Sequence, residues 1–293
     1  MNPILMDVQG LKTYFPIKGG VVRKTVGHVH AVEDVSFQIR EQETFGLVGE
    51  SGCGKSTTGK TILRMIEPTG GSVHFAGEDL CALSPEEMRL RRKDMQFIFQ
   101  DPYSSLNPRM TVRKLLEEPL ETHFKLSQGE RNEKTEGIMA KVGLPAEHLD
   151  RYPHQFSGGQ RQRICIARAL ALNPKVIIAD ESVSALDVSV QAQVLELLEH
   201  LREVHRLSYL FISHDMAVVE RICHRVAVMY GGQIVEIGRR DQVLGNPQHP
   251  YTKRLLSAVP MPDVDRKRDF KALLHEFEQP SPIKSKGFEA PAQ

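Results

Sequence analysis

A glycine-rich run that ends in lysine and serine is the clearest chemical signal in the sequence. Residues 49–56 read GESGCGKS, which fits the pattern GxxxxGK[ST], between an apolar strand predicted over 44–48 and a helix predicted over 57–66. In such a loop the backbone N–H groups surround phosphate oxygens, the lysine reaches the β and γ phosphates, and the serine ligates Mg²⁺. A tight turn with a surface lysine is the alternative, which the flanking elements disfavour. The residues predicted to hold a nucleoside triphosphate are Gly49, Ser51, Gly52, Cys53, Gly54, Lys55, Ser56 and Thr57.

Two acidic residues end a second apolar strand, predicted over 176–179. Asp180 stands where the end of a parallel strand would hold Mg²⁺ through its water shell. Glu181 would then face the γ-phosphate and polarise the attacking water as a general base. Two acids at a strand end are by themselves more typical of a solvated loop, and it is the glycine-rich loop earlier in the chain that favours catalysis.

Residues 156–163, FSGGQRQR, open a helix predicted over 158–172. A serine cap and two glycines at a helix N-terminus make an anion site, although an ordinary capped helix would start in the same way. The run resembles the LSGGQ signature of the ABC transporter ATPases. In that family the signature covers the γ-phosphate bound by the opposite subunit, so the resemblance implies a head-to-tail dimer that encloses two ATP molecules. The signature residues in this sequence are Ser157, Gly158, Gly159 and Gln160.

Three further residues match family motifs, in the family's order. Gln100 resembles the Q-loop glutamine, which approaches Mg²⁺ and links the core to a helical lobe. Asp187 resembles the D-loop aspartate at the dimer seam, and His214 resembles the switch histidine that contacts the γ-phosphate. The family also stacks an early aromatic residue on adenine, for which we favour Phe15 and leave its neighbour Tyr14 open.

Two stretches narrow the resemblance to one branch of the family. Residues 100–110, QDPYSSLNPRM, and 246–253, NPQHPYTK, are similar to segments of oligopeptide and dipeptide importer ATPases, a branch shared with nickel and glutathione importers. The version of the first stretch with Tyr103 resembles the second ATPase of a pair, which implies a heterodimer; a homodimer is the alternative. The expected partners are this second ATPase, two integral membrane permease subunits and an extracytoplasmic substrate-binding protein.

The cargo is not specified by these motifs: peptides are favoured, and nickel or glutathione remain alternatives. Many relatives continue into a tail with cysteines that can carry an iron–sulfur cluster, but no cysteine follows Cys223, so that cofactor is not expected. ATP and Mg²⁺ are the expected cofactors. A non-transport ABC ATPase is a rival from another class, disfavoured because the sequence shows a single cassette and no sustained heptads.

The order of patterns along the chain predicts the fold class. Residues 5–48 alternate in the manner of antiparallel strands, residues 102–155 are helical, and strands and helices alternate afterwards. This is typical of an α/β P-loop NTPase core with a parallel sheet, an antiparallel β subdomain and an inserted helical subdomain over about 101–157. Further helices are predicted over 112–120, 130–142, 188–205 and 217–224, and further strands over 35–39, 209–213, 226–230 and 233–237.

We divide the chain into an ABC ATPase domain over 1–240 and an importer-type C-terminal extension over 241–293, with a loose tail from Pro280. The net charge of +1 gives no general attraction to nucleic acid. Neither a signal peptide nor an apolar run of about 20 residues is found, and four scattered cysteines suit a reducing compartment. With the resemblance, this implies a peripheral protein at the cytoplasmic face of the inner membrane.

Overall fold

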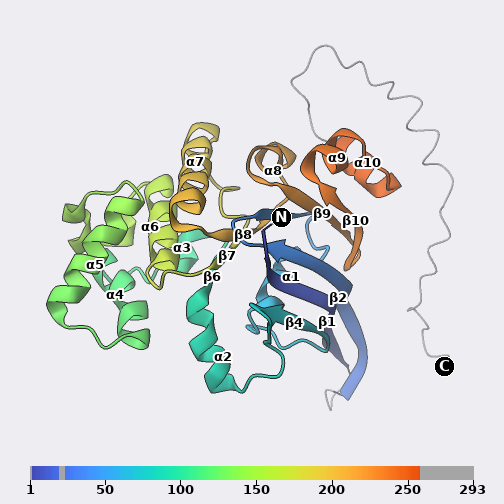
Figure 1. Ribbon diagram of the computed structural model, residues 1–293, viewed down its shortest axis with the longest axis horizontal. Coiled ribbons are helices and arrows are strands. Elements are labelled where there is room, and N and C mark those ends of the chain that lie inside the picture. Colours follow the sequence, from blue (N-terminus) through green and yellow to red (C-terminus); the bar gives the residue numbers. More distant parts are fainter. Residues whose placement is uncertain (1, 20–23, 258–293) are drawn as a thin grey trace, which may run out of the picture. The chain divides into compact units, whose positions relative to one another are not determined.

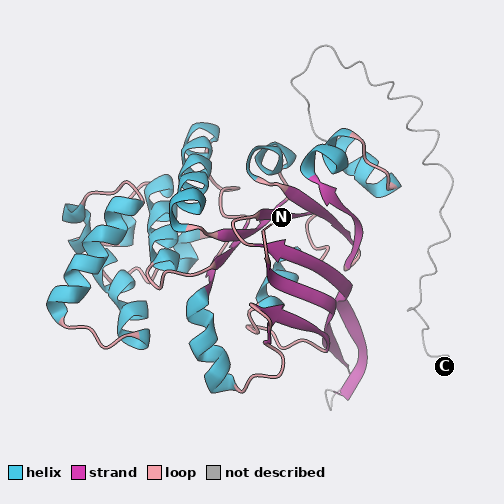
Figure 2. Cartoon of the chain, in the orientation of Figure 1, coloured by secondary structure: helices cyan, strands magenta, loops and turns pink. Residues whose placement is uncertain are grey.

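The computed structural model describes residues 2–19 and 24–257 of the chain. These residues form a six-stranded, mostly parallel sheet, a four-stranded antiparallel sheet, and helices that surround both (Figures 1 and 2). The predicted α/β class, with a parallel core, an antiparallel β subdomain and an inserted helical subdomain, is confirmed. The tail predicted from Pro280 lies outside the described residues.

The six-stranded sheet positions the strand ends on which the predicted site depends. Its strands are, in spatial order, β10 (Gln233–Arg239), β9 (Arg225–Tyr230), β3 (Thr44–Val48), β8 (Ser208–Ser213), β7 (Val176–Asp180) and β6 (Met95–Ile98). All neighbouring pairs are parallel except β9 with β10. Every residue of β3, β7 and β8 is buried, as expected of parallel strands covered on both faces. The carboxyl ends of five strands therefore meet at one edge of the sheet.

The antiparallel sheet has the order β2-β1-β4-β5. Its strands are β1 (Ile4–Gly19), β2 (Lys24–Arg40), β4 (Gly70–Phe75) and β5 (Glu78–Asp79). One face packs on the parallel sheet, where the ring of Phe37 stacks on that of Phe45 with centroids 4.9 Å apart. The N–H of Glu33 in β2 donates to the carbonyl of Gly232, in the turn between β9 and β10, at 2.7 Å. The two sheets are thus joined beside the predicted site.

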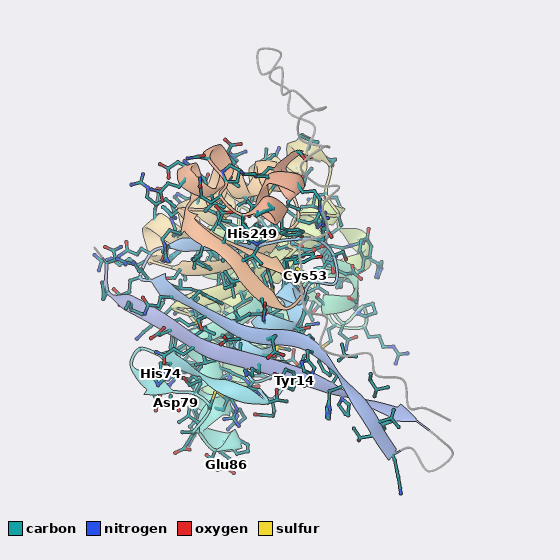
Figure 3. All side chains as sticks on the ribbon, turned by 90° about the vertical axis from the view of Figure 1, so that its right-hand side faces the viewer. Tyr14, Cys53, His74, Asp79, Glu86 and His249 are labelled. Atoms are coloured by element: carbon teal, nitrogen blue, oxygen red, sulfur yellow. The ribbon has the colours of Figure 1, made fainter. Side chains whose placement is uncertain are left out.

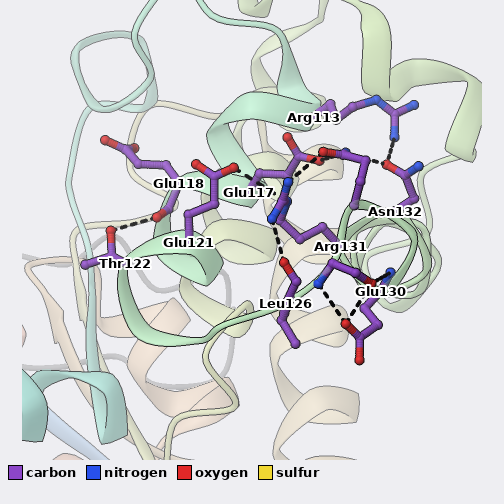
Figure 4. A network of polar contacts seen from close by, with 11 residues as sticks. Arg113, Glu117, Glu118, Glu121, Thr122, Leu126, Glu130, Arg131 and Asn132 are labelled. Carbon is purple, nitrogen blue, oxygen red and sulfur yellow. Dashed lines mark hydrogen bonds and ion pairs between the residues drawn. The ribbon is translucent and has the colours of Figure 1, made fainter.

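The predicted helical lobe is inserted between β6 and α6 (Gly158–Leu170), and Figure 1 shows its helices α4 and α5 at the opposite end of the parallel sheet from β10. Its elements are α3 (Pro102–Ser105), α4 (Val112–His123), α5 (Gln128–Lys141), η2 (Ala146–Asp150) and η3 (Pro153–Gln155). A polar network joins α4, α5 and the loop between them (Figure 4): Arg131 donates to the carbonyl of Leu126, in that loop, at 2.7 Å, and Arg113 donates to Asn132 at 3.3 Å. These contacts lie within the lobe and hold its helices together.

Of the remaining helices, α1 (Lys55–Ile62) and α8 (Met216–Ile222) lie where a helix was predicted but differ at their ends, and α7 (Val188–His205) has its predicted bounds. The sequence did not predict α2 (Pro85–Arg91), η1 (Arg92–Asp94), α9 (Arg240–Gly245) or α10 (Pro250–Ser257). The helix expected over 57–66 begins earlier, at Lys55, and stops at Ile62, because Arg64 adopts a left-handed backbone with φ of 48°. Among the described helices, none combines the length and the apolar character needed to cross a bilayer.

Tyr209 in β8 offers a test of the core. The residue is fully buried, and among the described residues its hydroxyl has no hydrogen-bond partner. Burial raises the pKa of this hydroxyl, so it stays neutral. An unpaired buried hydroxyl costs about 1–3 kcal/mol.

We therefore expect Tyr209→Phe to leave the free energy of unfolding unchanged or to raise it by about 1 kcal/mol, measured by chemical denaturation. Leu210→Ala, at the neighbouring buried position, should lower it by about 2–5 kcal/mol and serves as the reference. A loss of more than about 1 kcal/mol in Tyr209→Phe would mean that the hydroxyl has a partner.

Candidate active site

The glycine-rich loop predicted to bind phosphate runs from β3 into α1, between two walls of backbone. A Cβ atom added at Gly54 would lie 2.1 Å from the carbonyl oxygen of Ala31 in β2, and one added at Gly49 would lie 2.2 Å from that of Met229 in β9. Both glycines have positive φ, 108° and 151°. Side chains are therefore excluded from this part of the loop, and the backbone N–H groups are left to form the cradle.

Lys55 folds back onto its own loop. Its ammonium donates to the carbonyl oxygens of Gly49 and Glu50, both at 2.8 Å, and the residue is only 4% exposed. Both of these acceptors are neutral carbonyls, which the oxygens of a phosphate group can replace. The cradle and the lysine together fit a triphosphate.

Ser56 and Asp180 bring two oxygen ligands together at the C-terminal edge of the sheet. The Ser56 hydroxyl donates to Asp180 Oδ1 at 2.8 Å, across 124 residues of sequence. Burial raises the pKa of Asp180, and the hydrogen bond from Ser56 opposes that rise. A hydroxyl beside a carboxylate fits Mg²⁺, which in proteins keeps water and phosphate oxygens as its remaining ligands.

Glu181 follows β7 with a left-handed backbone, φ 44°, and its N–H donates to the carbonyl of Ile212 in β8 at 2.9 Å. Both carboxylate oxygens have partners: Gln100 Nε2 donates to Oε2 at 2.6 Å, and His214 Nδ1 lies 3.1 Å from Oε1. Gln100 follows β6 and His214 follows β8. The structure thus gathers three predicted catalytic residues from three parallel strands.

The signature residues cap α6 as predicted from their sequence. Ser157 Oγ accepts from the N–H of Gln160 at 3.4 Å, and Gln160 Oε1 accepts from the N–H of Ser157 at 3.1 Å. A Cβ at Gly159 would lie 2.3 Å from Val190 Cγ1, so this glycine lets α6 approach α7 closely. Within residues 2–19 and 24–257, no hydrogen bond joins the signature to the glycine-rich loop.

Asp187 caps the start of α7. Its Oδ1 accepts from the N–H of Val190 at 3.0 Å and from the hydroxyl of Ser189 at 2.7 Å. These hydrogen bonds lower the pKa of this exposed carboxyl. Asp187 is thus ionised and held in place at the surface, beside the cap of α6.

The two candidate aromatics point to opposite faces of β1. Thr13 Oγ1 lies 2.9 Å from Thr61 Oγ1 of α1. Phe15 is 39% exposed and, as the next residue of the strand, points to the face opposite Tyr14. Tyr14, labelled in Figure 3, donates to Glu33 at 2.7 Å and stacks on His30, with centroids 4.0 Å apart.

One contact at the loop was not expected from the sequence. The hydroxyl of Tyr251 in α10 accepts a hydrogen bond from the N–H of Glu50 at 3.0 Å. The sequence singled out the His-Pro-Tyr stretch as a mark of the branch, but 201 residues separate the two partners. No local pattern signals such a pairing.

With this geometry established, comparison with known proteins decides the family. A family model described as "ABC transporter" matches residues 32–184. The chain belongs to the ABC transporter family. A second model, "Oligopeptide/dipeptide transporter, C-terminal region", matches residues 235–287, which confirms the predicted branch.

Two curated relatives from different bacteria share one name. "Glutathione import ATP-binding protein GsiA" of Escherichia coli O157:H7 is 55% identical over 291 residues, which are 99% of this chain and 46% of the relative. The protein of the same name from Pectobacterium atrosepticum is 54% identical over 288 residues, 98% of this chain and 46% of the relative. This ABC-family chain therefore spans about half the length of these relatives.

Solved structures of ABC cassettes have the same fold. The dimeric post-hydrolysis state of the ATP-binding cassette MJ0796, bound to ADP and Pi, is 28% identical with a TM-score of 0.71, over 80% of this chain and 99% of that one. CbiO1 of Clostridium perfringens is 23% identical with a TM-score of 0.72, over 84% and 92% of the two chains. The predicted ABC-type ATPase cassette is confirmed, whereas the roles of single residues and the domain boundary at 240 stay predictions.

The close approach of the Ala31 carbonyl to Gly54 leads to a stability prediction. We expect Gly54→Ala to lower the free energy of unfolding by at least about 2 kcal/mol, because alanine resists a positive φ and its Cβ would meet the Ala31 carbonyl. Gly137→Ala, in open space within α5, should instead raise it by about 0.5–1 kcal/mol. Chemical denaturation of both variants measures the contrast, and equal effects would contradict the described cradle.

Proposed function

We propose that this chain is the ATP-hydrolysing subunit of an ABC importer for small peptides, acting as a peripheral protein at the cytoplasmic face of the inner membrane. The observation that carries the proposal is the convergence on one sheet edge of the glycine cradle, the Ser56–Asp180 pair and Glu181 with its two partners. The match to the ABC transporter family supports ATP as the nucleotide.

The residues of the cradle hold the triphosphate. The ammonium of Lys55 exchanges the carbonyls of Gly49 and Glu50 for phosphate oxygens, and the helix N-terminus of α1 adds its positive dipole. Ser56, Asp180 and Gln100 are the residues that would hold Mg²⁺. When bound, Mg²⁺ neutralises charge that develops on the phosphate oxygens.

Glu181 acts as the general base. Its carboxylate removes a proton from the attacking water, which requires it to be ionised and correctly aimed. Gln100 and His214 hold its two oxygens at 2.6 and 3.1 Å and so fix that aim. His214 is 53% exposed, and within the described part of the chain no hydrogen bond engages its other ring nitrogen, which can therefore reach a γ-phosphate.

A second subunit completes each site. The N-terminus of α6 is capped by the exposed residue Ser157 and has no hydrogen bond to the cradle within the described residues, which is consistent with an anion contact in another molecule. Gly158, Gly159 and Gln160 complete that contact, and Asp187 lies at the seam. The family relative MJ0796 is dimeric. We propose a head-to-tail heterodimer with a related ATPase, and a homodimer as the alternative.

The helical lobe couples closure of the ATPase dimer to the permease subunits in the membrane. A hollow of about 710 Å³ lies between the core and the lobe, lined by residues that include Phe99, Glu118 and Arg168. Phe99, which lines the hollow, directly precedes Gln100, so a permease segment docked there could respond to the contact between Gln100 and Glu181. Closure of the dimer would then move two permease subunits, to which an extracytoplasmic binding protein delivers cargo.

The cargo proposal is a small peptide. The match to an oligopeptide/dipeptide transporter region supports peptides in general, and the relatives named for glutathione import support glutathione, itself a tripeptide. Nickel is the other alternative suggested by the sequence.

The base assignment is tested by Glu181→Gln. The amide cannot take a proton, so ATP turnover should fall about 10²-fold or more while ATP binding is retained and the closed dimer accumulates. Lys55→Ala is the matched variant: it should weaken ATP binding at least about tenfold through the loss of charge-assisted bonds. Steady-state hydrolysis, an equilibrium binding titration and sedimentation separate the two effects, and normal turnover in Glu181→Gln would sink the assignment.

Adenine stacking is tested at β1. Phe15→Ala should weaken ATP binding about five- to 100-fold, the range expected for loss of one base–aromatic stack, and leave tripolyphosphate binding unchanged. Tyr14→Ala, on the opposite face, should leave both affinities unchanged. If Tyr14→Ala gave the selective loss instead, the stacking residue would be Tyr14.

A further inference from the structure

Helix α10 contacts the phosphate-binding loop at its second residue. The N–H of Glu50 donates to the hydroxyl of Tyr251 at 3.0 Å, and Tyr251 is 6% exposed. Among the described residues this hydroxyl is the partner of that N–H. The contact therefore satisfies a backbone donor of the loop from a segment near the C-terminal end of the described chain.

The planar peptide unit that contains the Glu50 N–H also contains the carbonyl of Gly49, which accepts from Lys55 Nζ at 2.8 Å. The carbonyl of Glu50, in the next peptide unit, accepts from Lys55 Nζ at 2.8 Å and from the N–H of Cys53 at 3.3 Å. Glu50 is thus held on one side by α10 and on the other by the groups that shape the cradle. A shift of its N–H away from Tyr251 would displace the Gly49 carbonyl against which Lys55 is placed.

Helix α10 is itself fixed to the core. The carboxylate of Glu236 in β10 accepts from the N–H groups of Gln248 and His249, at 2.8 and 3.0 Å, immediately before the helix. The ring of Tyr251 packs against that of Tyr230 in β9, with centroids 4.3 Å apart. His249, which directly precedes α10, and Cys53 of the loop are labelled in Figure 3.

A second contact between α10 and Glu50 contributes little. Arg254 lies 3.3 Å from the Glu50 carboxylate, but both side chains are about half exposed, at 52% and 53%. Water screens such a pair, and exposed pairs add almost nothing measurable. Of the two contacts between α10 and Glu50, the hydrogen bond of the buried Tyr251 hydroxyl is therefore the one that holds the loop in position.

We propose that Tyr251 is a positioning residue for the nucleotide site: its hydroxyl holds the Glu50 peptide, and through it the cradle and Lys55, in the geometry that receives phosphate. The proposal rests on the function proposed above. Because coupling between two sites is reciprocal, nucleotide binding and the docking of α10 strengthen each other.

The test is a binding titration of Mg-ATP to the full chain. Tyr251→Phe keeps the ring and removes the hydroxyl, and should weaken binding about two- to tenfold, the effect of one hydrogen bond. Tyr230→Phe, the stacked neighbour, is the matched control and should bind as the wild type does. Arg254→Met should also bind as the wild type does.

Amide hydrogen exchange without nucleotide provides the second measurement. In Tyr251→Phe the Glu50 amide should exchange faster by a similar factor, while amides in β8 keep their protection, which separates local positioning from a general loss of stability. If Tyr251→Phe matched Tyr230→Phe in affinity and in Glu50 exchange, the positioning role would be overturned. If the wild type bound no nucleotide, the proposed function would fall first and the inference with it.

Discussion

The carbonyl oxygens of Ala31 and Met229 stand where a Cβ atom of Gly54 or Gly49 would have to lie. One belongs to the antiparallel sheet and the other to the parallel sheet, so the cradle keeps its shape only while both sheets are packed together. The hydrogen bond from Glu33 to Gly232 joins them at that point. The phosphate site is thus a product of the junction of the two sheets as well as of its own motif.

The parallel sheet determines which side chains can act together. Strands β3, β6, β7 and β8 run in the same direction, so the residues that follow them meet at one edge. Asp180 reaches Ser56 there, and Gln100 and His214 reach Glu181. Gln100, which contacts Glu181, also lies directly before the inserted helical lobe, so the lobe is joined to the strand-end cluster through this residue.

Much of this arrangement could be predicted from the sequence, because glycine spacing, strand-end acids and helix caps are local signals. The helix over 188–205 was predicted with its observed bounds, whereas β6 was missed because four residues after a charged stretch carry too short a pattern. Helix α1 ends early because Arg64 adopts a left-handed backbone conformation, which the helix propensity of arginine does not predict. The contacts of Glu181 with Gln100 and of Glu50 with Tyr251 arise only from packing, and sequence separation hides them.

The internal partners of Lys55 and Glu181 have a consequence for the protein between turnovers. The ammonium rests on two carbonyls, and the carboxylate rests on an amide and an imidazole, so neither charge is left bare. Nucleotide binding must therefore exchange these partners for others, and only a ligand that offers several oxygens at once can replace the contacts already present. Small anions such as free phosphate or acetate would gain little free energy by displacing these contacts. They therefore do not occupy the site in place of the nucleotide.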